Sequence, residues 1–431
     1  MGRDRPHEHG FHLMWHTIYN EWGHAIPDNT AFFNELRRDH RITTKVEFLN
    51  TDFKEVEGGT IFSSDKTNEV TNFVSDGNID VDIDRGIRRT AELTLLNPTT
   101  EFTPHTDGFQ SEGPWVGKVY LNRMVRIWRG IYVGKQSLYV PVGTFFVDGA
   151  TVMVEQNMSL VNLTLSDRWK AIAKSYSGHD FTWPKNTHYN DIITDILNFG
   201  RIELNGRYGA VLDWMGSRDS DDRRTGAKTV IKQGVSRGDR LKELVRKWNL
   251  DAYFDPMGVF RTEDRTTERD RSTVWHFYSG PAQNDINGML VSLQRSFNDD
   301  NLYNHVVVIG TGSDKKGVTY TATRVDDNPR SKYNRDLMGD RVKLFESEDI
   351  ATQNQANRAL NRLWNMRVQL SETIEANVIA NPALEGDDVV LFTERDHVLV
   401  DDRYRLQRFN VPLVTSRQTM QASNIITGED I

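Results

Sequence analysis

The feature that most constrains this chain is an alternation of apolar and polar residues with a period of two, which recurs over much of its length. Residues 79–84 alternate isoleucine or valine with aspartate, and residues 91–95 alternate apolar residues with glutamate and threonine. Side chains of a strand point alternately to its two faces, so such stretches form half-buried strands. Further stretches of this kind lie at 119–127, 130–133, 140–147, 151–154 and 160–165. Short strands at this spacing predict a sandwich or a barrel.

The clearest helical signal lies in a mixed region that runs from about residue 176 to 290. Four apolar residues between Leu241 and Trp248 share one helical face, so that face must be buried. Ser236 and Asp239 have the spacing of a capping box, which predicts that the helix begins near residue 238. Residues 255–258 place Asp, Pro and Gly as a type I turn requires, so a short hairpin follows the helix.

The chain as a whole predicts an α+β fold that is mainly β. A second helical stripe in the mixed region spans residues 189–197, and strands resume after residue 289 around a helix at about 349–370. The order therefore indicates a β domain, an α+β insertion and a second β domain, and the two β segments could be relatives. The predicted domains are an N-terminal helical arm at 1–42, a first β-barrel domain at 43–175, an inserted α+β domain at 176–290 and a second β-barrel domain at 291–431 with the helix 349–370.

The N-terminal arm is set apart by its aromatic residues. Phe11, Trp15, Ile18, Tyr19 and Trp22 follow one another at helical spacing, and a second helix is expected over residues 30–40. A short helical arm with this much aromatic surface needs a surface to pack on. That surface is either the chain's own body or another subunit. We take Phe11, Trp15, Tyr19 and Trp22 as candidate partner contacts.

Composition removes several classes of function. The formal net charge is -8, with 61 acidic and 53 basic residues, which argues against phosphate backbones or anionic lipid as the main partner. The chain has no cysteine, so disulfides, thiolate nucleophiles and Cys-ligated metals are excluded. We find neither a secretory signal nor an apolar run long enough to span a membrane, and expect no membrane insertion by this chain.

Two stretches resemble metal sites, and both fail on spacing. His12 and His16 stand one helical turn apart, but no HExxH pattern accompanies them. Solvent-facing or interface histidines explain them better. Residues 80–84 resemble a calcium loop, but an EF-hand needs Gly and Glu where this chain has Arg85 and Ala91. We assign no metal site.

A glycine-rich stretch at 306–317 imitates a nucleotide-binding loop. Lys315 stands where the dinucleotide fingerprint needs its third glycine, and the P-loop lysine is replaced by Val318. The residues that follow are strand-like, so no helix N-terminus is present to hold a phosphate, and we expect a hairpin. The pattern G-x-S-x-G occurs at residues 234–238, but Ser236 is the cap of the predicted helix, so we do not take it as a nucleophile elbow. The sequence therefore predicts no catalytic residue and no cofactor, although a pair of carboxylates suited to glycoside cleavage stays open because their separation is a three-dimensional property.

Six stretches in order resemble the baseplate hub, or minor tail, proteins of long-tailed, siphovirus-like bacteriophages. Each stretch is short, and the resemblance rests on their order and spacing over residues 43–420, with the arm at 1–40 unmatched. One departure is Asn249-Leu250 after the central helix, where such proteins often have a Gly-Trp pair. The stretches are SDGNIDVDIDRGIRRTAELTLLN (75–97), VPVGTFFVDGATV (140–152), LTLSDRWKAIAKS (163–175), KWNLDAYFDPMGVF (247–260), LYNHVVVIGTG (302–312) and NPALEGDDVVLF (381–392).

The resemblance implies two barrel-like domains akin to tail-tube subunits, with smaller mixed domains inserted. Three copies of such a chain would present six barrels, which would let a threefold tail tip join a sixfold tail tube. The implied protein is a structural virion component rather than an enzyme: a homotrimeric hub ring at the tail tip, assembled in the host cytoplasm, that forms part of the DNA conduit. A conduit should not bind DNA, so we expect its lumen-facing positions to be net acidic.

The implied partners are other copies of the chain, the distal tail protein, tail-tip or central-fibre proteins and the tape-measure protein, while DNA passes without specific binding. The alternative function is a cell-wall-degrading or carbohydrate-binding tail-tip protein. Such an enzyme usually carries a separable catalytic domain beyond the hub, whereas this sequence runs about ten residues past its last hub-like segment. We therefore favour the structural function.

Overall fold

The computed structural model describes most of the chain, and every structural statement below refers to the described residues. The residues outside the description are 1–16, 51–52, 64–72, 99, 105–117, 156–157, 199–212, 216–223, 227, 249, 265–271, 281–287, 298–301, 313–317, 332, 349, 367–371, 395–398 and 426–431. Strands dominate the rest, so the predicted mainly β, α+β fold is confirmed. No described helix is both long and apolar enough to cross a membrane.

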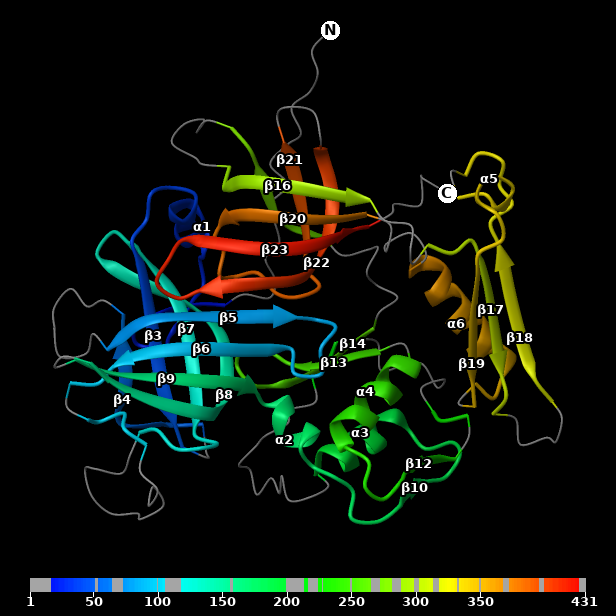
Figure 1. Cartoon of the computed structure of the whole chain (residues 1–431), viewed down its shortest axis with the longest axis horizontal. Coiled ribbons are helices and arrows are strands. Elements are labelled where there is room, and N and C mark those ends of the chain that lie inside the picture. The colour runs from blue at the N-terminus through cyan, green and yellow to red at the C-terminus, as the bar shows by residue number, and fades with distance from the viewer. Residues whose placement is uncertain are drawn as a thin grey trace, which may run out of the picture.

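One sheet contains strands from both the N-terminal and the C-terminal parts of the chain (Figure 1). Eight of its strands lie side by side in the order β16-β20-β23-β22-β5-β6-β9-β8, and every neighbouring pair is antiparallel. Their bounds are β5 Val74–Asp82, β6 Arg89–Leu96, β8 Gln136–Glu155, β9 Met158–Asp167, β16 Leu290–Phe297, β20 Glu372–Ile379, β22 Leu399–Pro412 and β23 Arg417–Asn424. We call these strands the eight-stranded sheet.

Two long strands, β8 and β22, each pair with strands of the eight-stranded sheet and also with strands outside it. The N-terminal half of β8 pairs with β7, which continues the order through β3 to β4, while its C-terminal half pairs with β9. In the same way β22 pairs first with β21 and then with β23, and β15 pairs with β21 in parallel. The strands outside it are β3 Ile42–Leu49, β4 Glu55–Phe62, β7 Met124–Val133, β15 Thr273–Tyr278 and β21 Val389–Glu394. We call β3–β9 the first β unit, and β15, β16 and β20–β23 the second β unit.

The two β units repeat one plan of strand pairing. In chain order, strands β5, β6, β7, β8 and β9 of the first unit correspond to β16, β20, β21, β22 and β23 of the second. Each set pairs in the same sequence: first strand with second, second with fifth, fifth with fourth, and fourth with third. The sequence suggested that the two β segments could be relatives, and their topology agrees at every one of these pairings.

Register irregularities fall at matching places in the two units. The ladder between β8 and β9 shifts between Val147 and Gly149, and the ladder between β22 and β23 shifts between Leu406 and Arg408. Superposing these shifts aligns residues 149–153 of β8 with residues 408–412 of β22. The same alignment matches Phe145 with Tyr404. Phe145 pairs with β7 on one side and β9 on the other, and Tyr404 pairs with β21 and β23 in the same way.

The first strands of the two units agree in the same way. The ladder between β5 and β6 shifts between Val74 and Asp76, and that between β16 and β20 shifts between Leu290 and Ser292. Residues 76–81 of β5 therefore correspond to residues 292–297 of β16. Extra residues at fixed places in a ladder bend and twist the strand, so their agreement means that the two β units share their local curvature as well as their topology.

The region between the β units forms a smaller α+β body whose core is separate from the main one. Its buried side chains include Trp169, Ile192, Leu244 and Phe260. Its elements are α2 Trp169–Ala173, β10 Phe181–Trp183, α3 Tyr189–Asn198, β11 Asp213–Met215, β12 Thr229–Ile231, α4 Arg237–Lys247, β13 Leu250–Phe254 and β14 Phe260–Asp264. The predicted capping box starts α4, because the Ser236 hydroxyl accepts a hydrogen bond of 3.2 Å from the Asp239 backbone N–H. The predicted hairpin is β13–β14.

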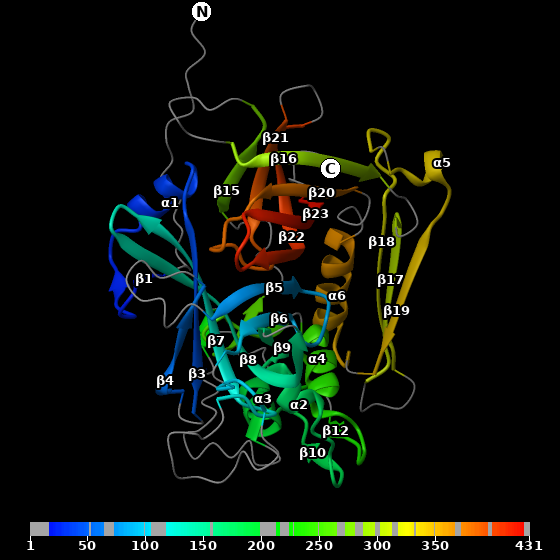
Figure 2. The same cartoon turned by 60° about the vertical axis from the view of Figure 1, so that its left-hand side comes forward.

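A third body projects from the second β unit between β16 and β20. Strands β17–β19 form a small sheet, and helix α6 packs against it through Val306, Val308 and Leu363 (Figure 2). Its elements are β17 His305–Gly310, β18 Tyr320–Val325, α5 Arg335–Met338, β19 Val342–Ser347 and α6 Gln353–Met366. The glycine-rich stretch at 306–317 thus leads from one strand toward another, as predicted for a hairpin, although residues 313–317 lie outside the described residues.

In the N-terminal arm, the first predicted helix is wrong for its described residues. Residues 18–20 and 25–26 form two short strands, β1 Ile18–Asn20 and β2 Ala25–Ile26, and β1 pairs with β8. Ladder bonds to β8 and the burial of Ile18 outweigh the helical spacing of the aromatic residues. The second predicted helix is present as α1 Thr30–Leu36, which buries Phe32, Phe33 and Leu36.

Candidate functional site

The outward face of the eight-stranded sheet is an extended polar surface. Strand alternation buries Ala91 and Leu93 and exposes Glu92 between them, and the same rule orients the paired strands. Among the polar outward positions are Thr151, Asn162, Thr164, Ser166, Thr90, Glu92, Thr94, Asn78, Asp80, Arg408, Asn410, Arg417, Thr419, Gln421, Thr373, Glu375, Asn377, Ser292, Gln294 and Ser296. We call this set the polar face.

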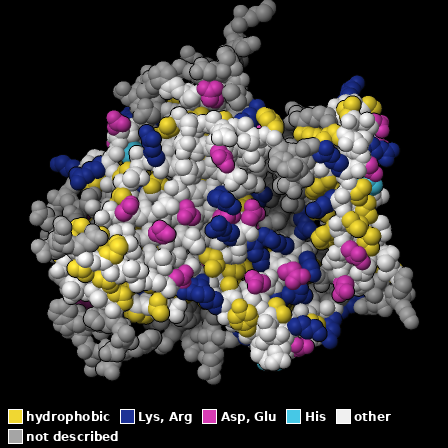
Figure 3. Space-filling view, in the orientation of Figure 1, with side chains coloured by type: hydrophobic (Ala, Val, Ile, Leu, Met, Phe, Trp, Pro, Cys, Tyr) yellow, Lys and Arg dark blue, Asp and Glu magenta, His cyan; other side chains and the backbone are white. Residues whose placement is uncertain are grey.

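Charge is sparse on the polar face, and none of its positions is lysine. Figure 3 shows it as mainly uncharged, with scattered acidic and basic side chains. Asp80, Glu92 and Glu375 are exposed acids, while the guanidinium of Arg408 lies 2.8 Å from the carboxylate of Asp82. That ion pair neutralises one of the two arginines on the face, so its net charge is acidic.

The two β units meet on this face along one short strand pair. Residues 408–412 of β22 pair antiparallel with residues 78–82 of β5. Asn410 lies opposite Asp80, and its Nδ2 donates a hydrogen bond of 2.9 Å to Oδ1 of Asn78. An open hollow of about 340 Å³ crosses this junction and is lined mainly by polar side chains of β5, β20, β22 and β23. We call the β22–β5 pair the internal junction.

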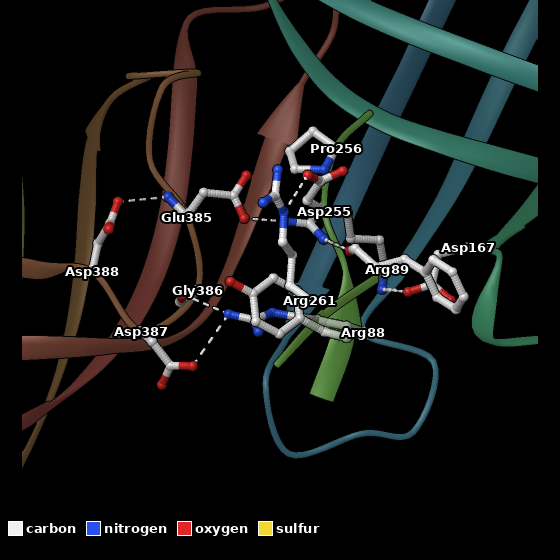
Figure 4. A network of polar contacts seen from close by, with 12 residues as sticks. Arg88, Arg89, Asp167, Asp255, Pro256, Arg261, Glu385, Gly386, Asp387 and Asp388 are labelled. Carbon is white, nitrogen blue, oxygen red and sulfur yellow. Dashed lines mark hydrogen bonds and ion pairs between the residues drawn. The ribbon is translucent and has the colours of Figure 1, made fainter. Parts of the chain in front are cut away.

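Behind the internal junction, a buried polar network ties three parts of the chain together (Figure 4). Arg89 of β6 donates a backbone hydrogen bond of 2.9 Å to Asp167 at the end of β9 and a side-chain hydrogen bond of 2.6 Å to the carbonyl of Phe254. It also forms an ion pair with Glu385 in the second β unit. One side chain therefore joins the first β unit, the inserted body and the second β unit.

Arg88, the residue before β6, supports the same link. Its guanidinium lies 3.3 Å from the carboxylate of Asp387, with both side chains almost fully buried, and 4.0 Å from the centre of the Tyr253 ring. Although burial disfavours its charge, Asp387 and the other nearby groups hold the pKa of Arg88 above its ordinary value. Breaking a buried pair of this kind is strongly destabilising, so the network fixes the relative position of the units.

The turn of the β13–β14 hairpin fits into the first β unit. The Thr144 hydroxyl donates a hydrogen bond of 2.9 Å to the carbonyl of Pro256, and Arg168 donates one to the carbonyl of Gly258. Gly258 has a φ of 79°, and a Cβ there would lie 3.0 Å from Cδ of Arg168 and 3.1 Å from Cβ of Thr144. Glycine is required by both backbone and space, so this turn is a fitted contact.

The eight-stranded sheet ends in two strand edges that no described strand of the chain covers. At one end β16 pairs with β20 alone, and at the other residues 149–155 of β8 pair with β9 alone. Apolar side chains are exposed at both edges: Phe297 is 69% and Val291 51% exposed on β16, and Val154 is 73% exposed on β8. An uncovered strand edge with apolar side chains is a template for pairing with another chain.

The predicted contact residues of the N-terminal arm are only partly visible. Phe11 and Trp15 lie outside the described residues. Tyr19 packs edge-on against Trp128 of β7, with 5.1 Å between ring centres, and pairs with Tyr139 of β8. Trp22 is 78% exposed. A role for these four residues in partner contact stays a prediction, and the structure shows that Tyr19 already has a partner within its own chain.

The described residues contain no group of three or more His, Asp or Glu residues placed to hold a metal ion. His12 and His16, the pair considered for metal binding, lie outside the described residues. The sequence did not reveal the two uncovered edges, because an edge is defined by the strands that fail to pair with it. The exposed Val-Met-Val run at 152–154 was the one local sign.

Comparison with solved structures places the fold among tail proteins. The chain superposes on a tail protein from Neisseria meningitidis MC58 with a TM-score of 0.59 and 10% identity, covering 89% of this chain and 97% of that one. A 43 kDa tail protein of prophage MuSo2 from Shewanella oneidensis gives a TM-score of 0.53 at 10% identity and covers 89% and 98% of the two chains. A prophage tail protein of Listeria monocytogenes EGD-e gives 0.51 at 10% identity, covering 90% and 95%.

These matches span nearly the whole length of each partner, so the likeness concerns the complete arrangement of bodies and not one domain. At such low identity it is a likeness of fold. No protein-family model and no curated protein matches the sequence.

Proposed function

We propose that this chain is a structural protein of a phage tail tip, and that three copies form a hub ring through which DNA passes. The observation that carries the proposal is the pair of equivalent β units whose strands join in one continuous sheet. Three copies offer six equivalent units, which is what a threefold component needs in order to meet a sixfold tube. The likeness in fold to three tail proteins supports it independently.

The dimensions of such a ring fit a conduit. Three copies of the eight-stranded sheet, with strands about 4.8 Å apart, give a backbone circumference of roughly 115 Å and a diameter of roughly 37 Å before strand tilt widens it. A bore of that order admits a DNA duplex. The polar face would line it, and its lack of lysine and its net acidity would keep phosphates from being held.

The proposal also assigns partners to the two ends of the ring. In this arrangement one end of the ring meets the distal tail protein, and the other meets tail-tip or central-fibre proteins and the tape-measure protein. The internal junction and the buried arginine network behind it provide rigidity. No step of catalysis is assigned to the chain, and its place is the tail tip of the virion, after assembly in the host cytoplasm.

Mass measurement and imaging together test the proposal. Native mass spectrometry of the purified chain is expected to show three times the 49.6 kDa of one copy, at concentrations where a closed ring is stable. Imaging of particles that carry a labelled chain should place the label at the tail tip around the axis. A chain that stays monomeric in solution and is absent from the tail tip would overturn the proposal.

A further inference from the structure

The internal junction is a template for a contact that a single chain cannot make. Within the chain, residues 408–412 of β22 pair with residues 78–82 of β5. The repeat of the two β units makes residues 149–153 of β8 equivalent to residues 408–412 of β22, and makes β16 equivalent to β5. Those equivalent strands are the two uncovered edges of the eight-stranded sheet. Each end of the sheet therefore carries a strand equivalent to one of the two strands of the internal junction.

We propose that β8 of one copy pairs with β16 of the next copy in the register of the internal junction. The inference rests on the proposed ring, since only a closed arrangement of identical chains satisfies both edges of every copy. Transferring the pairs Phe409–Val81, Asn410–Asp80, Val411–Ile79 and Pro412–Asn78 gives the contact its register. The transferred pairs are Ala150 with Phe297, Thr151 with Ser296, Val152 with Arg295 and Met153 with Gln294.

Strand direction agrees with this contact. Every neighbouring pair in the eight-stranded sheet is antiparallel, so the two edge strands of one copy run in opposite directions. Rotation about a ring axis preserves the direction of a strand along that axis. Strand β8 therefore meets the next β16 antiparallel, as β22 meets β5. An odd number of strands would have forced a parallel seam, for which the internal junction is no template.

Side chains at the seam are complementary in the same sense as at the internal junction. Phe297, which is 69% exposed in the single chain, would be covered opposite the small Ala150, in the place where Phe409 covers Val81. Thr151 and Ser296 would meet on the polar face, where Asn410 meets Asp80. Both are small hydroxyl residues that can hydrogen-bond across a strand pair. The seam thus continues the polar face without adding a charge to it.

The cysteine-free sequence allows a direct test by disulfide trapping. The variant Thr151→Cys/Ser296→Cys places two thiols opposite one another in the proposed register, at the Cα separation that a disulfide accepts. Under mild oxidation of the purified full chain, and of particles carrying it, we expect disulfide-linked species that stop at three copies on a non-reducing gel. Reduction should return them all to single chains.

Two matched variants control the test. Asp80→Cys/Asn410→Cys places thiols at the equivalent pair of the internal junction and should form an intrachain disulfide under the same conditions. Thr151→Cys/Ser292→Cys moves one thiol four residues along the same face of β16, about 13 Å away, and should trap at least tenfold less of the chain. Equal trapping by both seam variants would overturn the proposed register.

The possible failures separate this inference from the proposed function. A trimer by native mass, with an intrachain disulfide in the control and none at the seam, overturns the β8–β16 contact and leaves the hub ring standing. Linked species that close at another number of copies support the contact and overturn the trimer. A chain that forms no seam disulfide, stays monomeric and is absent from the tail tip overturns both.

Discussion

The guanidinium of Arg89 on β6 donates a hydrogen bond of 2.6 Å to the backbone carbonyl of Phe254, the last residue of β13. The two residues lie far apart in the sequence, and this bond anchors the inserted hairpin beneath the first β unit. The turn of the hairpin is held by Thr144 and Arg168 as well. These bonds pack the inserted body against the first β unit.

The fit of this turn predicts a measurable cost for a single methyl group. Gly258→Ala should lower the free energy of unfolding by about 2–4 kcal/mol, through backbone strain at positive φ and contact with Arg168 and Thr144. Urea unfolding monitored by tryptophan fluorescence measures it. Gly134→Ala is the control, since Gly134 has a φ of 61° and nothing within 4 Å of its Cβ position. That variant should cost about 1–2 kcal/mol, from the strain alone. Equal costs would contradict a fitted turn.

Asp167 predicts a pH dependence of stability. Burial raises the pKa of its carboxyl to about 6 from an ordinary 3.8, so the folded chain keeps a proton between these values that the unfolded chain has released. Stability should therefore fall as pH rises from 3.8 to 6, by about 2–3 kcal/mol from this group. Asp167→Asn removes this contribution at the cost of a hydrogen bond to Arg89 or Trp169. The gap in unfolding free energy between the two proteins should narrow over that window, whereas parallel curves would contradict the assignment.

The acidity of the polar face predicts what charge reversal does to DNA passage. Glu92→Lys/Glu375→Lys would place six lysines in a trimeric bore, so the ring should gain affinity for duplex DNA that falls roughly a thousandfold between 50 and 200 mM salt. Release of DNA from particles should slow in parallel, and gel shift and release assays measure the two effects. Asp327→Lys/Glu348→Lys makes the same charge change at exposed positions of the β17–β19 body. If both variants behaved alike, the polar face would not line the bore.

The exposure of Phe297 predicts that a substitution there weakens association between chains but leaves the folding of one chain almost unchanged. Phe297→Asp changes a side chain that is 69% exposed, so the unfolding free energy of the single chain should move by less than about 0.5 kcal/mol. Burial at the seam would make the same change costly there, with association weakened roughly a hundredfold. Sedimentation at several concentrations measures the association. Leu344→Asp, at a residue 59% exposed on β19, should leave association unchanged.

Local patterns in the sequence predicted local structure well. The alternating stretch at 79–84 lies in β5 as far as Asp82, and that at 91–95 lies in β6. The capping box starts α4, and the turn joins the strands of the β13–β14 hairpin, as expected. Each of these depends on residues within a few positions of one another. The helix expected at 349–370 is α6, which begins at Gln353 and is described as far as Met366.

Distant pairing was beyond the sequence. The stretches at 140–147 and 151–154 were expected as two strands, but they form the single strand β8, because a register shift at Gly149 bends the strand without ending it. The strand β15 lies in the range predicted for the inserted domain, yet it pairs with β21. Tyr19 joins a strand and not a helix, since its partners Trp128 and Tyr139 are supplied from more than a hundred residues away.

The internal junction also changes how a ring of such chains would come together. A covalent tether holds β5 and β22 at a high effective concentration, so that contact forms whenever one chain folds and does not depend on how many chains are present. Only alternate contacts around the circle would require an encounter between separate molecules. A gene that encodes both β units in one polypeptide thus halves the number of contacts that must form between separate molecules, from six to three, and it fixes the two kinds of unit in strict alternation.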